Sequence, residues 1–175
     1  MKLVFSIFIF CIAFCGYCQQ DEKIEGEEKE PRWAVSLTSI NSHIPQVEDP
    51  KAWSVIPAWG VGAEYKFSEK WFAFTLFEVE LVSYVVELEE GELLEREFPF
   101  IVCAGLGYEL LPGWALEAAY GREFEPTESF DLLHVATGYA FSLPRNWHVG
   151  PGFSLNTRFK GYPTWSFKIT FAKSF

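Results

Sequence analysis

The last stretch of the sequence, Trp165 to Phe175, alternates between large apolar side chains and small or polar ones. Every second residue from Trp165 to Phe171 is large and apolar, and Phe167 and Ile169 stand between these two. A period of two is typical of a β-strand with one apolar face. Such a strand is stable only beside other strands, so we expect the preceding chain to supply a sheet.

The amino-terminal residues 1–18 have the organisation of a secretory signal peptide. Met1-Lys2 is a basic start, Leu3–Phe14 is almost unbroken apolar sequence, and Gly16 and Cys18 occupy the small positions of a cleavage site. An apolar run of about a dozen residues is short for a bilayer-spanning helix. We therefore predict a cleaved signal peptide and secretion through the inner membrane.

A lipoprotein signal is the alternative for the same segment. It would place Cys15 or Cys18 in a lipobox, but Phe14 or Tyr17 would then stand where a small residue belongs. Whether Cys18 is lipidated stays open at the level of sequence.

Composition argues against several kinds of site. After cleavage Cys103 is the one remaining cysteine, which offers neither a disulfide framework nor a cysteine zinc site. The net charge of −10 argues against a nucleic-acid partner, which requires basic patches. Much of the acid lies in residues 21–30, so we predict an acidic flexible spacer over 19–31. No cofactor is predicted.

From residue 32 to residue 175 the sequence divides into alternating segments. The eight predicted strands are 32–40, 53–67, 71–87, 96–109, 114–122, 129–141, 147–158 and 165–175. Short connections at 68–70, 111–113 and 142–146 alternate with longer ones at 41–52, 88–95 and 123–128; the last connection, at 161–163, is short. An even number of strands with alternating short turns and long loops is typical of an up-and-down barrel.

The aromatic residues indicate which face of these strands points outward. Aromatics flank every short turn and both ends of the predicted barrel, all on the apolar face. This predicted girdle consists of Trp33, Phe67, Trp71, Tyr108, Trp114, Phe141 and Trp147, with Phe175 closing the last strand. Trp53, Phe98, Tyr120 and Trp165 stand near the opposite strand ends. Two aromatic rings are typical of the two interfaces of a membrane.

The polar face is unusually rich in small residues. It carries Ala58, Gly60, Gly62, Gly105, Gly107, Ala119, Gly121, Ala136, Gly138, Gly150 and Gly152. Glycine weakens a water-facing strand, but small residues suit the narrow interior of an eight-stranded barrel. We therefore predict an all-β, eight-stranded antiparallel up-and-down transmembrane β-barrel with a polar small-residue interior and aromatic girdles.

The chain thus resembles small bacterial outer-membrane barrels of the OmpA-transmembrane-domain or OmpX type. Its terminal amphipathic strand, with Phe171 and Phe175, resembles their assembly signal. The resemblance implies residence in the cell outer membrane, contact with outer-membrane lipid and recognition by the barrel-assembly machinery. It says little about function.

Charged residues on the polar face predict an interior network. Its members are Glu64, Glu78, Glu80, Glu117, His134, Arg158 and Lys168. If Arg122 pairs roughly with Ser129, Glu117 lies opposite His134; Asn156 falls near Lys168. Unpaired buried charge is costly, so we interpret the network as an electrostatic plug. Acid–base work by Glu78 and Glu80 is the alternative.

The histidines do not suggest a metal site. The predicted registers separate His134 from His148 by roughly 20 Å at about 3.3 Å per residue, and His43 falls in a loop.

A lipid A deacylase of the PagL type would need a His-x-Ser pair, whereas His134 is followed by Val135 and Ala136. We predict no catalytic residues.

Two non-enzymatic functions remain. The first is a structural or surface-interaction role, in which loops meet an extracellular protein or another surface partner. There, the hairpin formed by the third and fourth strands would project above the bilayer. The alternative is a narrow, porin-like channel. Eight strands leave little lumen once side chains fill it, so conduction would require the charged network to open. A lipid A-modifying enzyme is the less favoured third reading.

Overall fold

The computed structural model describes residues 31–47, 52–88, 91–159 and 161–175. The predicted signal peptide, residues 1–18, and residues 19–30 of the predicted spacer lie outside these ranges. Within the described part of the chain, no helix is long and apolar enough to cross a bilayer.

The described residues form eleven β-strands and one turn of 3-10 helix. The strands are β1 (Trp33–Pro45), β2 (Trp53–Lys66), β3 (Trp71–Glu80), β4 (Tyr84–Glu87), β5 (Leu93–Arg96), β6 (Phe100–Leu111), β7 (Trp114–Phe124), β8 (Phe130–Tyr139), β9 (Phe141–Leu143), β10 (Trp147–Arg158) and β11 (Pro163–Ser174), and the helical turn is η1 (Pro144–Asn146).

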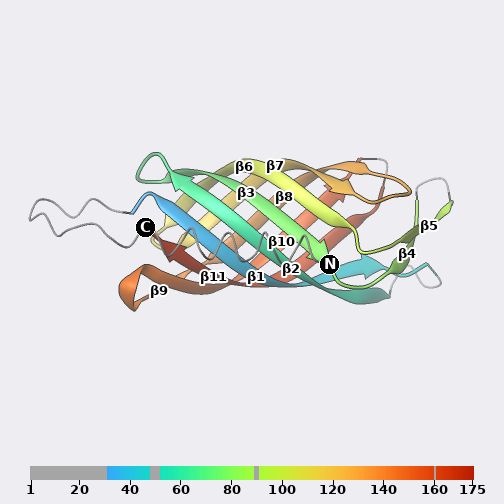
Figure 1. The fold of residues 1–175 in the computed structure, drawn as a ribbon, viewed down its shortest axis with the longest axis horizontal. Helices are drawn as coiled ribbons and strands as arrows, with labels where there is room; N and C mark the ends of the chain where they lie inside the picture. The colour runs from blue at the N-terminus through green and yellow to red at the C-terminus, as the bar shows by residue number, and fades with distance from the viewer. Residues whose placement is uncertain (1–30, 48–51, 89–90, 160) are drawn as a thin grey trace, which may run out of the picture. The chain divides into compact units, whose positions relative to one another are not determined.

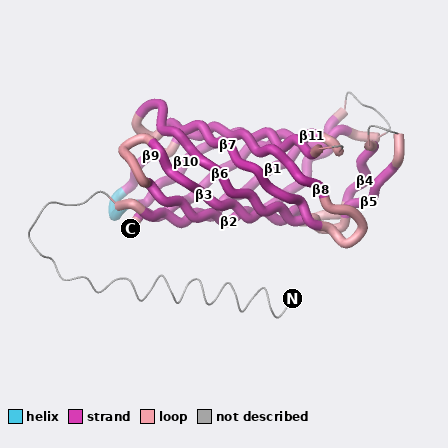
Figure 2. The backbone as a smooth tube through the Cα atoms, turned by 90° about the horizontal axis from the view of Figure 1, so that it is seen from above, coloured by secondary structure: helices cyan, strands magenta, loops and turns pink. Residues whose placement is uncertain are grey.

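Nine of these strands make one antiparallel sheet that closes on itself. The order is β11-β1-β2-β3-β6-β7-β8-β10-β9, and β11 also pairs with β10. Strands β8 and β9 pair with successive parts of β10 and fill one position between them, so the barrel has eight positions (Figures 1 and 2). The predicted closed eight-stranded barrel is confirmed.

Two of the predicted strand boundaries are wrong. Segment 71–87 is not one strand, because β3 ends at Glu80 and β4 belongs to a separate two-stranded sheet with β5. Segment 96–109 likewise begins too early, since β6 starts at Phe100. The chain turns at Phe98, whose φ of 47° is in the left-handed region, and Pro99 follows. Proline has no N–H for the ladder, so it favours a break there.

The long connection predicted over 41–52 is also wrong at its start. Strand β1 continues to Pro45 and pairs with β2 as far as Trp53. The loop between them is therefore confined to residues 46–52.

The two faces of the sheet differ as predicted. Inward positions hold small or polar side chains, many of them buried. Cross-strand hydrogen bonds join Thr38 to Thr170 at 3.1 Å and Ser42 to Ser166 at 3.0 Å. Outward positions hold exposed large apolar side chains along every barrel position, among them Leu37, Val61, Phe77, Leu106, Leu116, Val135, Leu155 and Ile169. The barrel is polar inside and apolar outside.

The predicted girdle residues lie at the end of the barrel where the described chain begins and ends. Trp33, Phe67, Trp71, Trp114, Phe141 and Trp147 are exposed, and Tyr108 is half-buried. Trp71 and Tyr108 are register partners whose ring centroids lie 4.9 Å apart. Their role at a membrane interface stays a prediction.

Candidate functional site

Strands β4 and β5 form a hairpin, here called the cap, at the end of the barrel opposite the carboxyl terminus (Figure 1). Val86 and Leu94 point inward from its two strands. They form one buried cluster with Ile44 of β1, Ile56 of β2, Phe130 of β8 and Tyr162 of the β10–β11 connection. These partners come from opposite sides of the barrel. The cap therefore covers the mouth of the barrel and does not continue its strands outward.

Arg96 of β5 holds the cap to the barrel. Its side chain is fully buried and forms ion pairs with Glu123 at the end of β7 and, at 3.3 Å, with Glu125. The Nη1 atom also donates to the backbone carbonyl of Glu128 at 2.7 Å. The guanidinium lies 5.1 Å from the ring centroid of Phe130. A buried charge with this many partners is costly to remove.

A second buried arginine, Arg158 of β10, continues this network beneath the cap. Its Nε donates to Glu123 at 2.6 Å, its Nη1 donates to Thr164 at 3.1 Å, and Glu80 of β3 lies 3.9 Å from Nη2. Tyr162 stacks over the guanidinium at 4.2 Å and donates its hydroxyl to Glu123 at 3.2 Å. Glu123 is thus shared by both arginines.

The hydroxyl groups of Tyr84 and Tyr162 join the cap to the same network. They are 2.8 Å apart, across the boundary between the cap and the β10–β11 connection. Burial raises the pKa of Tyr84 well above its ordinary value, so this phenol stays protonated and able to donate.

Glu125 stays ionised under the cap. Burial alone would raise the pKa of this carboxyl, but hydrogen bonds from the backbone N–H groups of Thr127 and Glu128, together with the charge of Arg96, hold it below its usual range.

A third set of contacts crosses the middle of the barrel. Lys168 of β11 donates to Glu78 of β3 at 2.5 Å, and β1 and β2 separate these strands in the sheet. His134 of β8 is fully buried and its Nδ1 lies 2.6 Å from Oδ1 of Asn156. The Lys168–Glu78 pair therefore spans the lumen below the cap network.

The predicted pairing of Glu117 with His134 is wrong. Arg122 lies opposite Asp131, two residues beyond the predicted partner, because β7 runs on to Phe124 while β8 begins only at Phe130. Glu117 consequently faces Ala136, and His134 faces Ala119. The predicted nearness of Asn156 to Lys168 is also wrong, since their register partners are Thr164 and Gly152.

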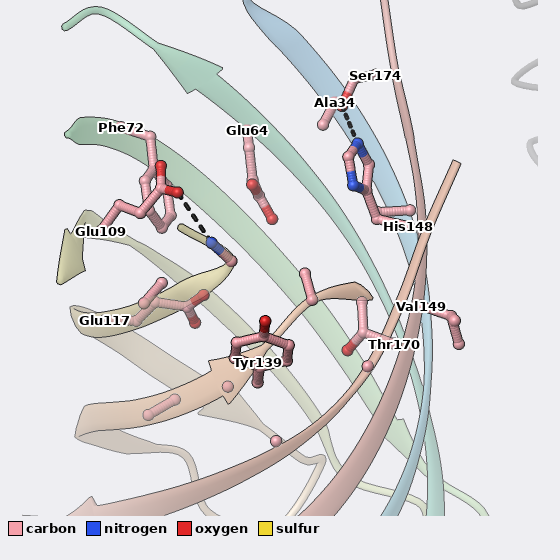
Figure 3. Close-up of a pocket in the computed structure, with 18 of the residues that line it drawn as sticks. Ala34, Glu64, Phe72, Glu109, Glu117, Tyr139, His148, Val149, Thr170 and Ser174 are labelled. Carbon is pink, nitrogen blue, oxygen red and sulfur yellow. Dashed lines mark hydrogen bonds between the residues drawn. The ribbon is translucent and has the colours of Figure 1, made fainter. Parts of the chain in front are cut away.

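A cavity of about 340 Å³, here called the vestibule, occupies the barrel on the side of the termini. Figure 3 shows Glu64 and Glu117 pointing into it, and neither carboxylate has an ion-pair partner among the described residues. On the wall formed by β10 and β11, Ser174 lies 3.1 Å from Nε2 of His148. Lys168 lines its inner end. The vestibule is therefore open space that stops at the central ion pair.

The seven predicted network residues thus occupy three levels. Glu80 and Arg158 belong to the cap network, Glu78, His134 and Lys168 lie at mid-barrel, and Glu64 and Glu117 line the vestibule. Within the described ranges, no three His, Cys, Asp or Glu side chains are grouped to hold a metal ion.

Arg96, Glu123 and Tyr162 were missed because the sequence placed them at strand ends or in loops. One signal was available in the sequence: Pro99 falls inside the predicted strand 96–109, and a proline has no N–H for the ladder. In the structure the buried positions change there from even-numbered, as at Arg96, to odd-numbered, as at Ile101.

Neither a protein-family model nor a curated protein sequence matches this chain. Solved structures do match in fold. The N-terminal β-barrel domain of Pseudomonas aeruginosa OprF has a TM-score of 0.52 at 8% identity, over 82% of this chain and 99% of that one. Neisserial surface protein A gives 0.51 at 10% identity, covering 82% and 97%.

The attachment invasion locus protein Ail of Yersinia pestis, in complex with the heparin analogue sucrose octasulfate, also gives 0.51, at 14% identity and coverage of 82% and 99%. These identities are low enough that the likeness concerns the fold. The chain has the closed eight-stranded barrel fold of small bacterial outer-membrane proteins.

Proposed function

We propose that this protein resides in a bacterial outer membrane and acts through contacts at its capped end, with its interior closed. The exposed apolar belt around the barrel supports a lipid environment. The short connections lie at the end that carries the termini, which is the periplasmic side in barrels of this fold. The cap would then face the outside of the cell.

The cap across the mouth is the observation that carries this proposal. A channel needs a continuous water path, whereas here the cap, the Arg96–Glu123–Arg158 network and the Lys168–Glu78 pair lie one behind another. Ion pairs buried at this depth keep their geometry because each charge left alone would be strongly destabilising. A fixed, closed end favours recognition over transport.

Cysteine labelling on intact cells tests location and orientation together. Glu92 lies in the cap and Glu69 in the β2–β3 turn at the opposite end, and both side chains are exposed. A membrane-impermeant maleimide should label Glu92→Cys on intact cells and Glu69→Cys only after permeabilisation. The native Cys103 is buried and should give little background. The reverse pattern, or no label at either site on intact cells, contradicts the proposed placement.

A narrow channel is the second candidate, and the vestibule favours it. A cavity of about 340 Å³ is already open on the side of the termini and reaches Lys168. Planar-bilayer recording separates the two candidates. We expect the wild-type protein to produce no steps of conductance, and regular steps would favour the channel.

We further propose that the protein is not a lipid A deacylase. His134 is buried in the interior, away from the lipid-facing surface, and Ala136 stands where the deacylase serine is expected. Mass spectrometry of lipid A from cells with and without the protein should give the same acylation pattern.

A polyanionic ligand is not proposed either. Ail binds a heparin analogue, but the outer surface of the cap in this chain carries carboxylates.

A further inference from the structure

The outer face of the cap alternates apolar and acidic side chains. Because Val86 and Leu94 point into the barrel, their neighbours point away from it. Val85 lies opposite Glu95, and Glu87 lies opposite Leu93. Val85 is 47% exposed and Leu93 is 59% exposed. The outer face therefore presents apolar and acidic side chains in a checkerboard.

The negative charge of this face is not neutralised by ion pairs within the described part of the chain. Glu92 and Glu97 flank the checkerboard and are exposed, as Glu87 and Glu95 are. None of these four carboxylates forms an ion pair with a described residue. Arg96, the arginine of the hairpin, is turned inward. Carboxylates clustered in this way create a local potential that attracts cations.

An apolar groove lies between β4 and the rim of the barrel, at the edge of the outer face. It has a volume of about 300 Å³ and is lined mainly by Pro45, Val86, Leu88, Tyr162 and Pro163. Glu87 stands at this groove as well. If a bound polypeptide places an apolar side chain in the groove, the flanking residues of that polypeptide therefore lie beside the carboxylate of Glu87.

The cap is held in place before any partner arrives. Its inner side is fixed by the buried Arg96 ion pairs and by the Tyr84–Tyr162 hydrogen bond. A surface that is already ordered loses less conformational entropy on binding than a mobile loop does.

We propose that the outer face of the cap is a docking surface for a cationic, amphipathic polypeptide segment. An apolar side chain of the segment occupies the groove, and its lysine or arginine side chains meet Glu87 and Glu95. Charge complementarity selects this partner over an acidic or neutral one and speeds its association. The inference rests on the proposed function, because the cap must face the outside of the cell to meet a partner.

The test uses the full mature protein in nanodiscs of zwitterionic lipid. The probe is a fluorescent synthetic peptide of alternating lysine and leucine, and empty nanodiscs give its background binding to lipid. We expect saturable binding above that background, weakened by added salt because exposed charges are screened. Glu87→Gln combined with Glu95→Gln should weaken binding by roughly 1.5- to fivefold for each carboxylate removed, the range for exposed ion pairs.

The matched control removes the same charge elsewhere. Glu69→Gln changes the net charge as much as Glu87→Gln alone does, and its exposed side chain lies in the β2–β3 turn at the other end of the barrel. This variant should bind the peptide as tightly as the wild type, whereas Glu87→Gln should bind it less tightly. An equal loss in both single variants would mean that net charge alone attracts the peptide, and would overturn the proposal.

Two further probes test the apolar part of the site. A peptide of alternating glutamate and leucine should not bind, and oligolysine should bind more weakly than the lysine–leucine peptide. Oligolysine that binds equally well would overturn the role of the groove. Cysteine labelling keeps the two proposals apart: a cap that is labelled on intact cells but does not bind the peptide refutes only the docking surface.

Discussion

At the scale of single residues, the small side chains of the interior set how closely neighbouring strands approach. A Cβ atom added at Gly105 would lie 2.1 Å from the carbonyl oxygen of Ala118 and 2.5 Å from Cα of Ala119. Both contacts are with backbone atoms of β7, so no side chain can rotate away to relieve them. Strand β6 would have to move from β7 to accommodate any larger residue.

Gly105→Ala should therefore destabilise the barrel by about 1–3 kcal/mol, the usual cost of overpacking. Gly138→Ala is the matched control, because its added Cβ would meet no atom closer than 3.4 Å. It should be neutral or slightly stabilising, since alanine restricts the unfolded chain. Unfolding in detergent followed by tryptophan fluorescence measures both variants. Equal losses would show that the close approach at Gly105 has no energetic effect.

At the scale of elements, the barrel strands were predictable because their signal is local. Alternation along one strand, such as Trp165 to Phe171, reports directly which face is apolar. The cap was not predictable in the same way. Tyr84 and Val86 keep the even-numbered inward phase of Glu78 and Glu80, so periodicity continues unbroken across the bend after β3. Only contacts with distant segments decide that the hairpin folds over the mouth.

The same limit applies to the candidate site. Sequence could place Glu78, Glu80, Arg158 and Lys168 inside, because facing follows from alternation. It could not choose their partners, since a pair such as Lys168–Glu78 crosses the lumen between strands that are not neighbours. The register error at Glu117 has a related cause. Nothing in the local sequence shows that the last pair of the β7–β8 ladder is Glu123 with Phe130.

Arg96→Met should release the cap without unfolding the barrel. Removing one partner of a buried ion pair typically costs about 3–5 kcal/mol. In Arg96→Met the loss falls on the ion pairs that hold β5 to the end of β7. Hydrogen exchange should show loss of protection in β4 and β5, with the barrel strands unchanged. Arg122→Met is the control, because its pair with Asp131 is about half exposed and contributes at most about 1 kcal/mol. Unchanged exchange in Arg96→Met would contradict the anchoring role.

Acidification should loosen the cap through Glu125. Its folded-state pKa lies below its ordinary value of about 4.3, so its contribution to stability is complete above that value. The contribution is lost as pH falls through the folded-state pKa, where the carboxyl becomes protonated and loses the charge that pairs with Arg96. Hydrogen exchange of β5 amides, corrected for the intrinsic pH dependence, should report this loss. In Glu125→Gln the acid-dependent step should disappear.

At the scale of the whole molecule, closure depends on the pairing of the last strand with the first. Strand β11 pairs with β1 from Ser174 opposite Ala34 to Trp165 opposite His43. Phe175 extends this ladder, since its N–H donates to Trp33 O at 2.8 Å and its carbonyl accepts from Arg32 N at 3.1 Å. Its side chain is exposed on the apolar outer surface. Phe175 thus combines a backbone closure with an outward aromatic group, and two variants can separate them.

Deleting Phe175 should strongly reduce the amount of folded barrel in the outer membrane, because it removes both the closing hydrogen bonds and the aromatic side chain. Phe175→Ala keeps the backbone, so a comparable loss in that variant assigns the effect to recognition of the aromatic residue. Ser174→Ala is the neighbouring control, losing one hydrogen bond to His148 worth about 1 kcal/mol.

The readouts are the heat-modifiable mobility of membrane fractions and refolding of each purified variant in detergent. Closed barrels satisfy their backbone hydrogen bonds internally, so the folded form should resist detergent until it is boiled. Normal refolding of Phe175→Ala in detergent, with poor assembly in cells, is the result expected of an assembly signal, whereas equal assembly of Phe175→Ala and Ser174→Ala would refute that reading.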